Sequence, residues 1–203
     1  SPIWHKDEWY TLDHKTRDES KTSLLGDAAN IPLPEGSCEL IFCGHMFEHI
    51  PHVRLENILV EFNRVLARDG VLRILSPDLR KIATAYVARD EAFFEQALKE
   101  DYNIRTDLGL GGMLMNFVVS PGQDTALFNR QLTEFVCGYA HLYLYDVEML
   151  TILLERCGFY SVKQRAFCDS DIPELREPLH VVGMDPVWHN FNKAFYEKNK
   201  LIH

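Results

Sequence analysis

Short apolar runs alternate along this chain with apolar residues at helical spacing. Continuous or alternating apolar runs predict six strands, over residues 8–13, 23–25, 38–43, 71–75, 161–167 and 179–184. Apolar residues three and four positions apart predict helices over 52–67, 79–99, 124–137 and 146–157. Turn residues predict irregular connections over 31–37 and 101–120, and Gly70 and Gly158 are expected to stop two of the helices.

This order of elements indicates an α/β fold with a mostly parallel sheet. The last two predicted strands are joined by a loop of about ten residues, which favours an antiparallel last strand at the edge of that sheet. The helical stretch over residues 79–140 is expected to form an insertion after the strand at 71–75. We predict one domain over residues 1–185, followed by a polar C-terminal tail over 186–203.

Composition narrows the possible functions. Hydrophobic residues make up 46% of the chain and charged residues 25%, as in ordinary globular proteins. The formal net charge of -9 argues against broad, charge-driven binding, so no nucleic-acid partner is expected. No apolar run approaches the roughly 18 residues of a membrane span, and residues 1–10 lack a signal-peptide pattern. We therefore expect a cytoplasmic protein without a membrane span.

The cysteine pattern points to free thiols. The count is odd, and no two of the five lie at CxxC spacing: Cys38, Cys43, Cys137, Cys157 and Cys168. A zinc site or a disulfide framework is therefore not expected, and the thiols are predicted to be buried or half-buried in a reducing compartment.

Polar side chains follow several of the predicted parallel strands. A doubly wound sheet binds its ligand outside the carboxyl ends of its strands, so these groups are expected to meet at one edge. They arise from separate parts of the chain: Asp13, Asp27-Ala28, the run from Gly44 to His49, and Ser76-Pro77-Asp78. The row as a whole is more informative than any single member.

The order and spacing of these groups resemble a known family. Residues 26–83 contain DA, LPEGS, HMFEH, RVLARDG and SPD in that order, and residues 145–159 add YD, LL and CGF. This stretch resembles class I S-adenosylmethionine-dependent methyltransferases, most closely the small bacterial predicted methyltransferases. The resemblance implies a Rossmann-like fold in which the strand at 71–75 is the fifth. It also implies S-adenosylmethionine as cofactor, S-adenosylhomocysteine as product, and a small-molecule, glycan, lipid or protein acceptor that the sequence does not identify.

The resemblance also assigns cofactor-binding residues. Asp13 matches the acid that accepts hydrogen bonds from the ribose diol, and Asp27 matches the acid beside the adenine amine, where the Ala28 N–H faces the ring. Gly44 and His45 match the point facing the methionine part and the acceptor. His45 is the first candidate for a general base. The simpler alternatives are a surface acid, a turn aspartate and a structural histidine.

Five further residues are candidates for the acceptor side of the site. Each also has a structural alternative, either favourable charge at a helix N-terminus or packing in the core. They are Glu48, His49, Asp78, His141 and Tyr145.

Two motifs are expected to be uninformative. HMFEH places His45 and His49 four residues apart, but its glutamate adjoins the second histidine, so the HExxH pattern of metalloproteases is not met and no metal is expected. LGLGG at 108–112 follows no strand and does not complete GxGxxG, so we expect a flexible loop on the acceptor side.

One element of the family pattern is absent from this sequence. In the family, a first strand and a glycine-rich cofactor loop precede the region that corresponds to residues 9–13, and residues 1–7 contain no glycine. Three explanations stay open: the native protein has a further N-terminal piece, another chain completes the sheet, or the domain no longer binds the cofactor. The last would make the protein a non-catalytic binding or scaffold protein. A nicotinamide-dependent oxidoreductase is disfavoured because no dinucleotide fingerprint is present, and a homo-oligomer is possible.

Overall fold

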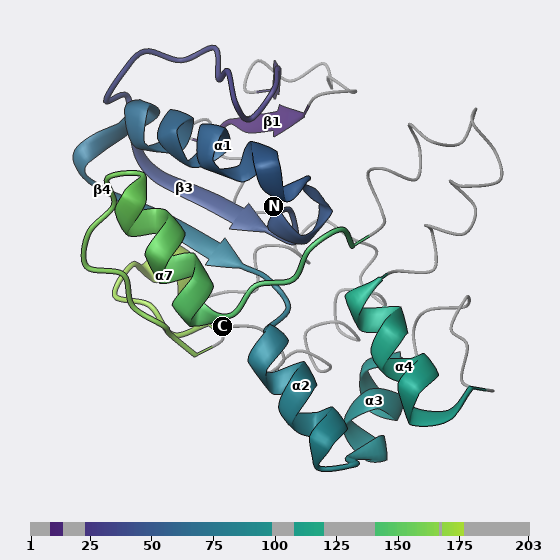
Figure 1. Cartoon of the computed structure of the whole chain (residues 1–203). Coiled ribbons are helices and arrows are strands. Elements are labelled where there is room, and N and C mark those ends of the chain that lie inside the picture. Colours follow the sequence, from purple (N-terminus) through teal and green to yellow (C-terminus); the bar gives the residue numbers. More distant parts are fainter. Residues whose placement is uncertain (1–8, 14–22, 99–107, 120–140, 167, 177–203) are drawn as a thin grey trace, which may run out of the picture.

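The computed structural model describes residues 9–13, 23–98, 108–119, 141–166 and 168–176. Within these ranges the chain runs through short strands, then alternating strand and helix, then helices alone (Figure 1). The strands are β1 (Thr11–Asp13), β2 (Ser23–Leu25), β3 (Cys38–Gly44) and β4 (Leu66–Leu75). The helices are η2 (Phe47–His49), α1 (His52–Val65), α2 (Leu79–Val87), α3 (Glu91–Leu98), α4 (Gly109–Val118), α7 (Val147–Arg156) and η3 (Pro173–Arg176).

Every ladder among the described strands is parallel, which confirms the mostly parallel α/β prediction. β1 pairs with β2, and β3 pairs with β4, as two separate two-stranded sheets. The Gly26 N–H donates to the Asp13 carbonyl at 3.0 Å, and the His45 N–H donates to the Leu75 carbonyl at 2.8 Å. Each pair therefore ends in register, and the residues that follow the strands begin side by side.

The main core lies between β3, α1 and α7. The stripe predicted for α1 is buried as expected, and α7 supplies the facing side chains: Leu55, Ile58, Leu59, Phe62 and Val65 from α1, and Leu153, Leu154 and Cys157 from α7 and its end. Asp146 caps α7 by accepting from the Met149 N–H at 2.9 Å, and Gly158 leaves the helix at φ +91°. Both ends of α7 were correctly predicted.

The first helix ends earlier than its pattern predicted. α1 stops at Val65, and β4 begins at Leu66 and runs through Gly70, so Gly70 is not the helix stop. The ladder to β3 shifts register between Cys38 and Leu40, which accommodates the extra residues of β4. A Cβ on Gly70 would lie 3.1 Å from the Cys38 carbonyl. The glycine therefore permits a close approach of two backbones instead of ending a helix.

The helix predicted over residues 79–99 is two helices. α2 ends at Val87, Arg89 adopts φ +54°, and α3 starts at Glu91. The Asp90 carboxylate accepts from the Phe93 N–H at 3.0 Å, so a capping aspartate begins a new helix where the apolar stripe continued.

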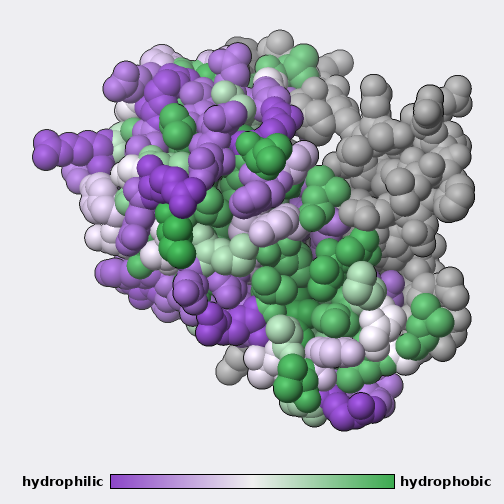
Figure 2. Space-filling model, viewed as in Figure 1, coloured by the Kyte–Doolittle hydropathy of each residue, from purple (hydrophilic) through white to green (hydrophobic). Residues whose placement is uncertain are grey.

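The flexible loop predicted at 108–112 was also wrong, because α4 occupies Gly109–Val118. Its apolar residues pack with α2 and α3 around a second core of Ile82, Ala85, Phe94 and Leu144. Apolar side chains gather on the surface over these helices (Figure 2). The packing of these partly buried side chains outweighs the low helix propensity of glycine. That this region is an insertion stays a prediction, as does the helix over 124–137, which lies outside the described residues.

The strand predicted over residues 161–167 is not formed within 161–166. Ser161 adopts φ +57°, and the Arg73 guanidinium donates to the carbonyls of Ala166 and Asp169, both at 3.2 Å. Side-chain hydrogen bonds therefore hold this segment where a ladder was expected. The strand predicted over 179–184, and with it the antiparallel edge, lies outside the described residues.

Cys38, Cys43 and Cys157 are thiols that are buried or half-buried, as predicted. Burial, with the Glu48 charge as a smaller cause, raises the pKa of the Cys43 thiol well above its ordinary range. No helix within the described parts of the chain is long and apolar enough to cross a membrane.

A charged pair fastens the turn-rich connector to α1. Glu61 accepts from the Ile31 N–H at 2.7 Å and from Arg64 through both carboxylate oxygens, each at 2.7 Å. Arg64 also donates to the carbonyls of Leu33 and Ile31, at 3.0 and 3.1 Å. The hydrogen bonds from Arg64 and the Ile31 N–H outweigh partial burial and hold the pKa of the Glu61 carboxyl below its ordinary 4.5.

Glu61→Gln is expected to lower the free energy of unfolding by about 1–2 kcal/mol at neutral pH, because it weakens charge-assisted hydrogen bonds. The pKa is lowered in the folded state, so the carboxylate stabilises the fold above the ordinary pKa of 4.5 and stops doing so as the pH falls through its folded-state value. Urea denaturation at several pH values should show the two proteins converging below about pH 4.5. A difference that is constant with pH would contradict this assignment.

Candidate functional site

The candidate site begins at the turn after β3. Gly44 ends the strand, and His45 adopts φ +52°, which is uncommon for a residue other than glycine. This conformation turns the chain into the short helix η2, where the Phe47 side chain is completely buried in the main core. Phe47 thereby anchors the turn between the two flanking polar residues, His45 and Glu48.

Glu48 is a buried acid with polar partners. Its side chain is 0% exposed, its Oε1 lies 3.0 Å from His45 Nδ1, and the Ser76 hydroxyl donates to its Oε2 at 3.5 Å. Burial alone would raise the pKa of the Glu48 carboxyl. The hydrogen bond from His45, the charges of His45 and His49, and the backbone N–H outweigh it, so the pKa is lowered. The site therefore holds a buried carboxylate anion.

Residues 141–146 cross the ends of β3 and β4. The Leu142 N–H donates to the Glu48 carbonyl at 2.6 Å, and the Leu79 N–H donates to the Tyr145 carbonyl at 3.0 Å. Asp78 and Tyr145 form a parallel bridge. A segment distant in sequence is thus fixed against both turns that follow the sheet.

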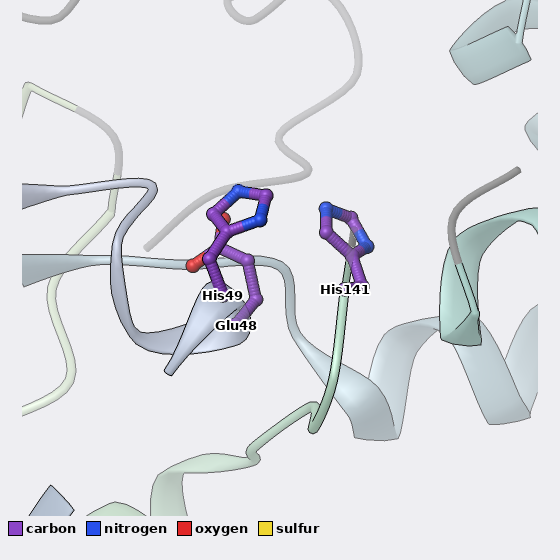
Figure 3. Close-up of side chains that lie close together, drawn as sticks. All are labelled: Glu48, His49 and His141. Atoms are coloured by element: carbon purple, nitrogen blue, oxygen red, sulfur yellow. The ribbon is translucent and has the colours of Figure 1, made fainter. Parts of the chain in front are cut away.

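This crossing brings His141 to the turn after β3. The His49 and His141 rings meet edge to face with centroids 5.1 Å apart, and His141 Nδ1 lies 2.7 Å from the Phe117 carbonyl. Figure 3 shows the Glu48 carboxylate beside the His49 ring at the turn, and the His141 ring next to His49 on the crossing segment. Of the predicted acceptor-side residues, the structure therefore gathers Glu48, His49 and His141, with His45 beside them.

Tyr145 lies at the edge of this group. Its ring is 1% exposed and its hydroxyl lies 3.5 Å from His52 Nδ1, while His52 stacks on Tyr143 with centroids 4.5 Å apart. Burial, and to a smaller extent Tyr143, raise the pKa of the Tyr145 phenol to about 12. Tyr145 is therefore packed in the core, as its structural alternative predicted. Its contact with an acceptor stays a prediction.

Asp78 is the N-terminal capping residue of α2. Its Oδ1 accepts from the N–H groups of Arg80 and Lys81, at 2.9 and 3.3 Å, and so caps α2. The other carboxylate oxygen is not needed for that cap, so a contact with an acceptor remains a prediction.

The residues predicted to hold the cofactor follow the other pair of strands. Asp13 ends β1 with an exposed side chain, directly beside Gly26 after β2. Asp27 accepts from the Ala29 N–H at 2.8 Å and pairs with Arg54 at 2.7 Å, and both partners of that ion pair are about half exposed. Ala28 packs against the main core. Asp27 thus makes the turn contacts of the simpler alternative, and the cofactor roles of Asp13, Asp27 and Ala28 stay predictions.

Two contributors to the site were not singled out in the sequence. Ser76 was noted only as part of the row of polar groups, and the Phe117 carbonyl belongs to a segment expected to be a loop. A backbone carbonyl cannot be recognised from the type of residue that carries it. The contact of the Phe117 carbonyl could therefore have been predicted only from the position of α4.

A cavity of about 550 Å³ lies elsewhere, between β4, α7 and residues 158–175. Only its end at Ser76, Pro77, Asp78 and Tyr145 reaches the strand ends. The cavity follows the length of β4, whereas the buried carboxylate and the histidines lie at the turn after β3. We therefore place the candidate site at the turn after β3, because the reactive side chains gather there, and not in the cavity along β4.

Residues 8–74 match the model of a protein family described as "Methyltransferase domain". The matched stretch is a third of the chain and runs from the residues before β1 to one residue before the end of β4. This confirms the resemblance over that stretch and agrees with a Rossmann-like α/β fold. Searches among curated proteins and among solved structures gave no match.

Proposed function

We propose that this protein, whose residues 8–74 form a segment of methyltransferase-domain type, transfers a methyl group from S-adenosylmethionine to an acceptor. The observation that carries the proposal is the family match over the same strands whose carboxyl ends carry the polar row. Parallel α/β sheets bind ligands at that edge. The cofactor and the acceptor class both belong to the proposal.

The two strand pairs would contact different parts of the cofactor. Asp13 after β1 would accept hydrogen bonds from the ribose hydroxyls, and Asp27 after β2 would face the adenine amine. The Asp27–Arg54 ion pair is half exposed on both sides, so releasing it costs little. Gly44 and His45 after β3 would face the methionine part and the acceptor.

The bound cofactor would supply an electrophilic methyl group on a sulfonium. The protein's contribution is then proximity and in-line orientation, which can supply several kcal/mol of the barrier. With an oxygen or nitrogen acceptor, His45 would take the acceptor's proton. Its Nδ1 is 3.0 Å from the Glu48 carboxylate, which favours the proton on Nδ1 and leaves Nε2 as the base.

Calorimetric titration with S-adenosylmethionine and S-adenosylhomocysteine tests the proposal. Saturable binding of both, at one site per chain, would support it. Absence of binding to either would overturn it and favour the rival, a non-catalytic binding or scaffold protein of the same fold. Bound nicotinamide dinucleotide in the same assay would instead point to an oxidoreductase. The methyl acceptor, a cytoplasmic location and a homo-oligomer stay predictions.

Asp13→Asn is expected to weaken S-adenosylhomocysteine binding by about 10- to 100-fold, because an amide offers one acceptor oxygen and no charge to a diol that carries two donors. Calorimetry of the variant measures the change. Glu39→Gln is the matched control, since Glu39 is an exposed acid near the opposite end of β3 and should leave the affinity unchanged. Equal weakening by both variants would show a general charge effect and remove Asp13 from the site.

A further inference from the structure

We propose that Glu48, His49 and His141 bind a divalent transition-metal ion. One ligand atom from each side chain, a carboxylate oxygen and two ring nitrogens, lies within 4.8 Å of the others. Figure 3 shows the three side chains extending into one space from two separate segments. The proposal departs from the expectation of no metal, which considered only the histidines and the glutamate of HMFEH.

The donor set specifies the kind of ion. Two imidazoles and one carboxylate suit zinc, iron, cobalt or nickel, whereas calcium and magnesium prefer oxygen ligands alone. Metal–ligand distances of about 2.0–2.2 Å place neighbouring ligand atoms roughly 3 to 3.5 Å apart. The three groups would therefore need only small side-chain rotations to close around an ion. Three protein ligands also leave at least one position for water or an acceptor atom.

Two of the ligands are already oriented. The Phe117 carbonyl is 2.7 Å from His141 Nδ1, which places the proton on that nitrogen and directs the lone pair of Nε2 outward. Metal-binding histidines in proteins commonly donate their second ring N–H to a backbone carbonyl in this way. The hydrogen bond from the Leu142 N–H to the Glu48 carbonyl, at 2.6 Å, fixes the backbone of His141 against that of Glu48.

The carboxylate is buried and held as an anion. Glu48 is 0% exposed, and His45 and Ser76 contact its two oxygens at 3.0 and 3.5 Å, which leaves further lone pairs for an ion. Hydrogen-bonded carboxylates of this kind are typical of metal sites. A buried carboxylate beside two imidazole rings is electrostatically suited to a cation.

This inference does not rest on the proposed function, because metal binding is measured without methyl transfer. The protein is first stripped with a chelator and then titrated with Co²⁺, which reports nitrogen and oxygen ligands through visible d–d absorption. Zn²⁺ calorimetry gives the affinity and the number of ions. One ion per chain with cobalt absorption is the expected result, and no saturable binding of either ion would overturn the proposal.

Variants assign the ligands. His49→Ala and His141→Ala should each weaken Zn²⁺ binding by about 100-fold or more, the size expected from losing a ligand where an outer partner alone costs 10- to 100-fold. His52→Ala is the matched control, since His52 contacts Tyr145 and Tyr143 and not the three ligands, and its affinity should stay within about threefold of the unsubstituted protein. Unchanged binding in both ligand variants would show that other histidines take the ion.

Circular dichroism of the stripped proteins checks that the variants are folded. If His141→Ala unfolds, His49→Ala decides alone, because the hydrogen bond that joins the Leu142 N–H to the Glu48 carbonyl is formed by backbone atoms and does not involve the His49 side chain. A further readout is the unfolding temperature of the unsubstituted protein, which should rise with Zn²⁺ concentration and not with Mg²⁺.

Discussion

His45→Ala is expected to lower kcat for methyl transfer by about 10²- to 10⁴-fold, the usual contribution of a general base. His45 follows β3 directly, and its side chain is 28% exposed, although its Nε2 atom is buried. Its Nδ1 contact with Glu48, at 3.0 Å, would orient the ring. The effect on the affinity for S-adenosylhomocysteine should be much smaller.

The measurement is S-adenosylhomocysteine release in the presence of an acceptor found by the same assay. Alanine also removes a hydrogen bond from the buried Glu48, which is expected to cost about 1–3 kcal/mol of stability, so the folded fraction must be checked at the assay temperature. Added imidazole should restore part of kcat in His45→Ala, which a purely structural loss would not allow. A variant with undiminished kcat would exclude His45 as the base.

Gly158→Ala is expected to lower the free energy of unfolding by about 2–3 kcal/mol. Gly158 has φ +91°, a backbone conformation that costs an L-residue roughly 1–2 kcal/mol. The new Cβ would lie 2.5 Å from Asn63 Nδ2, and that amide donates to the Cys157 carbonyl at 2.9 Å. The asparagine would have to move, and the end of α7 would lose a hydrogen bond.

Two comparisons separate these causes. Gly36→Ala has a similar φ of +66° with nothing within 4 Å of the new Cβ, so chemical denaturation should show only the backbone cost, about 1 kcal/mol. In an Asn63→Ala background, Gly158→Ala should likewise cost only the backbone term. Equal losses for Gly36→Ala and Gly158→Ala would show that the contact with Asn63 carries no weight.

The sequence predicted those elements whose local signals and packing agree. The apolar run of β3, the stripe of α1, and the Asp146 and Gly158 ends of α7 were all placed correctly. Gly44 ends β3, and Asp146 and Gly158 mark the two ends of α7, where the apolar pattern stops.

The errors arose where packing or capping overrode the local pattern. The glycines at 109–112 suggested a loop, yet apolar packing against α2 and α3 makes them part of α4. Gly70 suggested a helix stop, but the close approach of Cys38 requires it inside β4. The Asp90 cap divided a continuous apolar stripe into two helices.

For the candidate site, the sequence predicted the row of polar groups but not which of them meet. Glu48 and His49 are adjacent in the chain, whereas His141 belongs to a distant segment that the hydrogen bond from the Leu142 N–H to the Glu48 carbonyl helps to hold beside them. A spacing pattern such as HMFEH identifies side chains that are neighbours along a helix. It does not identify a side chain from a distant segment that a backbone hydrogen bond holds nearby.

That backbone hydrogen bond also has a consequence for the order of assembly. The four described strands and α1 are complete once the chain reaches Leu75, but the segment holding His141 and Tyr145 comes more than 60 residues later. Contacts of such long sequence separation close large loops and tend to form slowly. During synthesis, the β3–β4 unit would therefore emerge with Glu48 facing water, and the histidine cluster would be completed only when α7 docks on the main core.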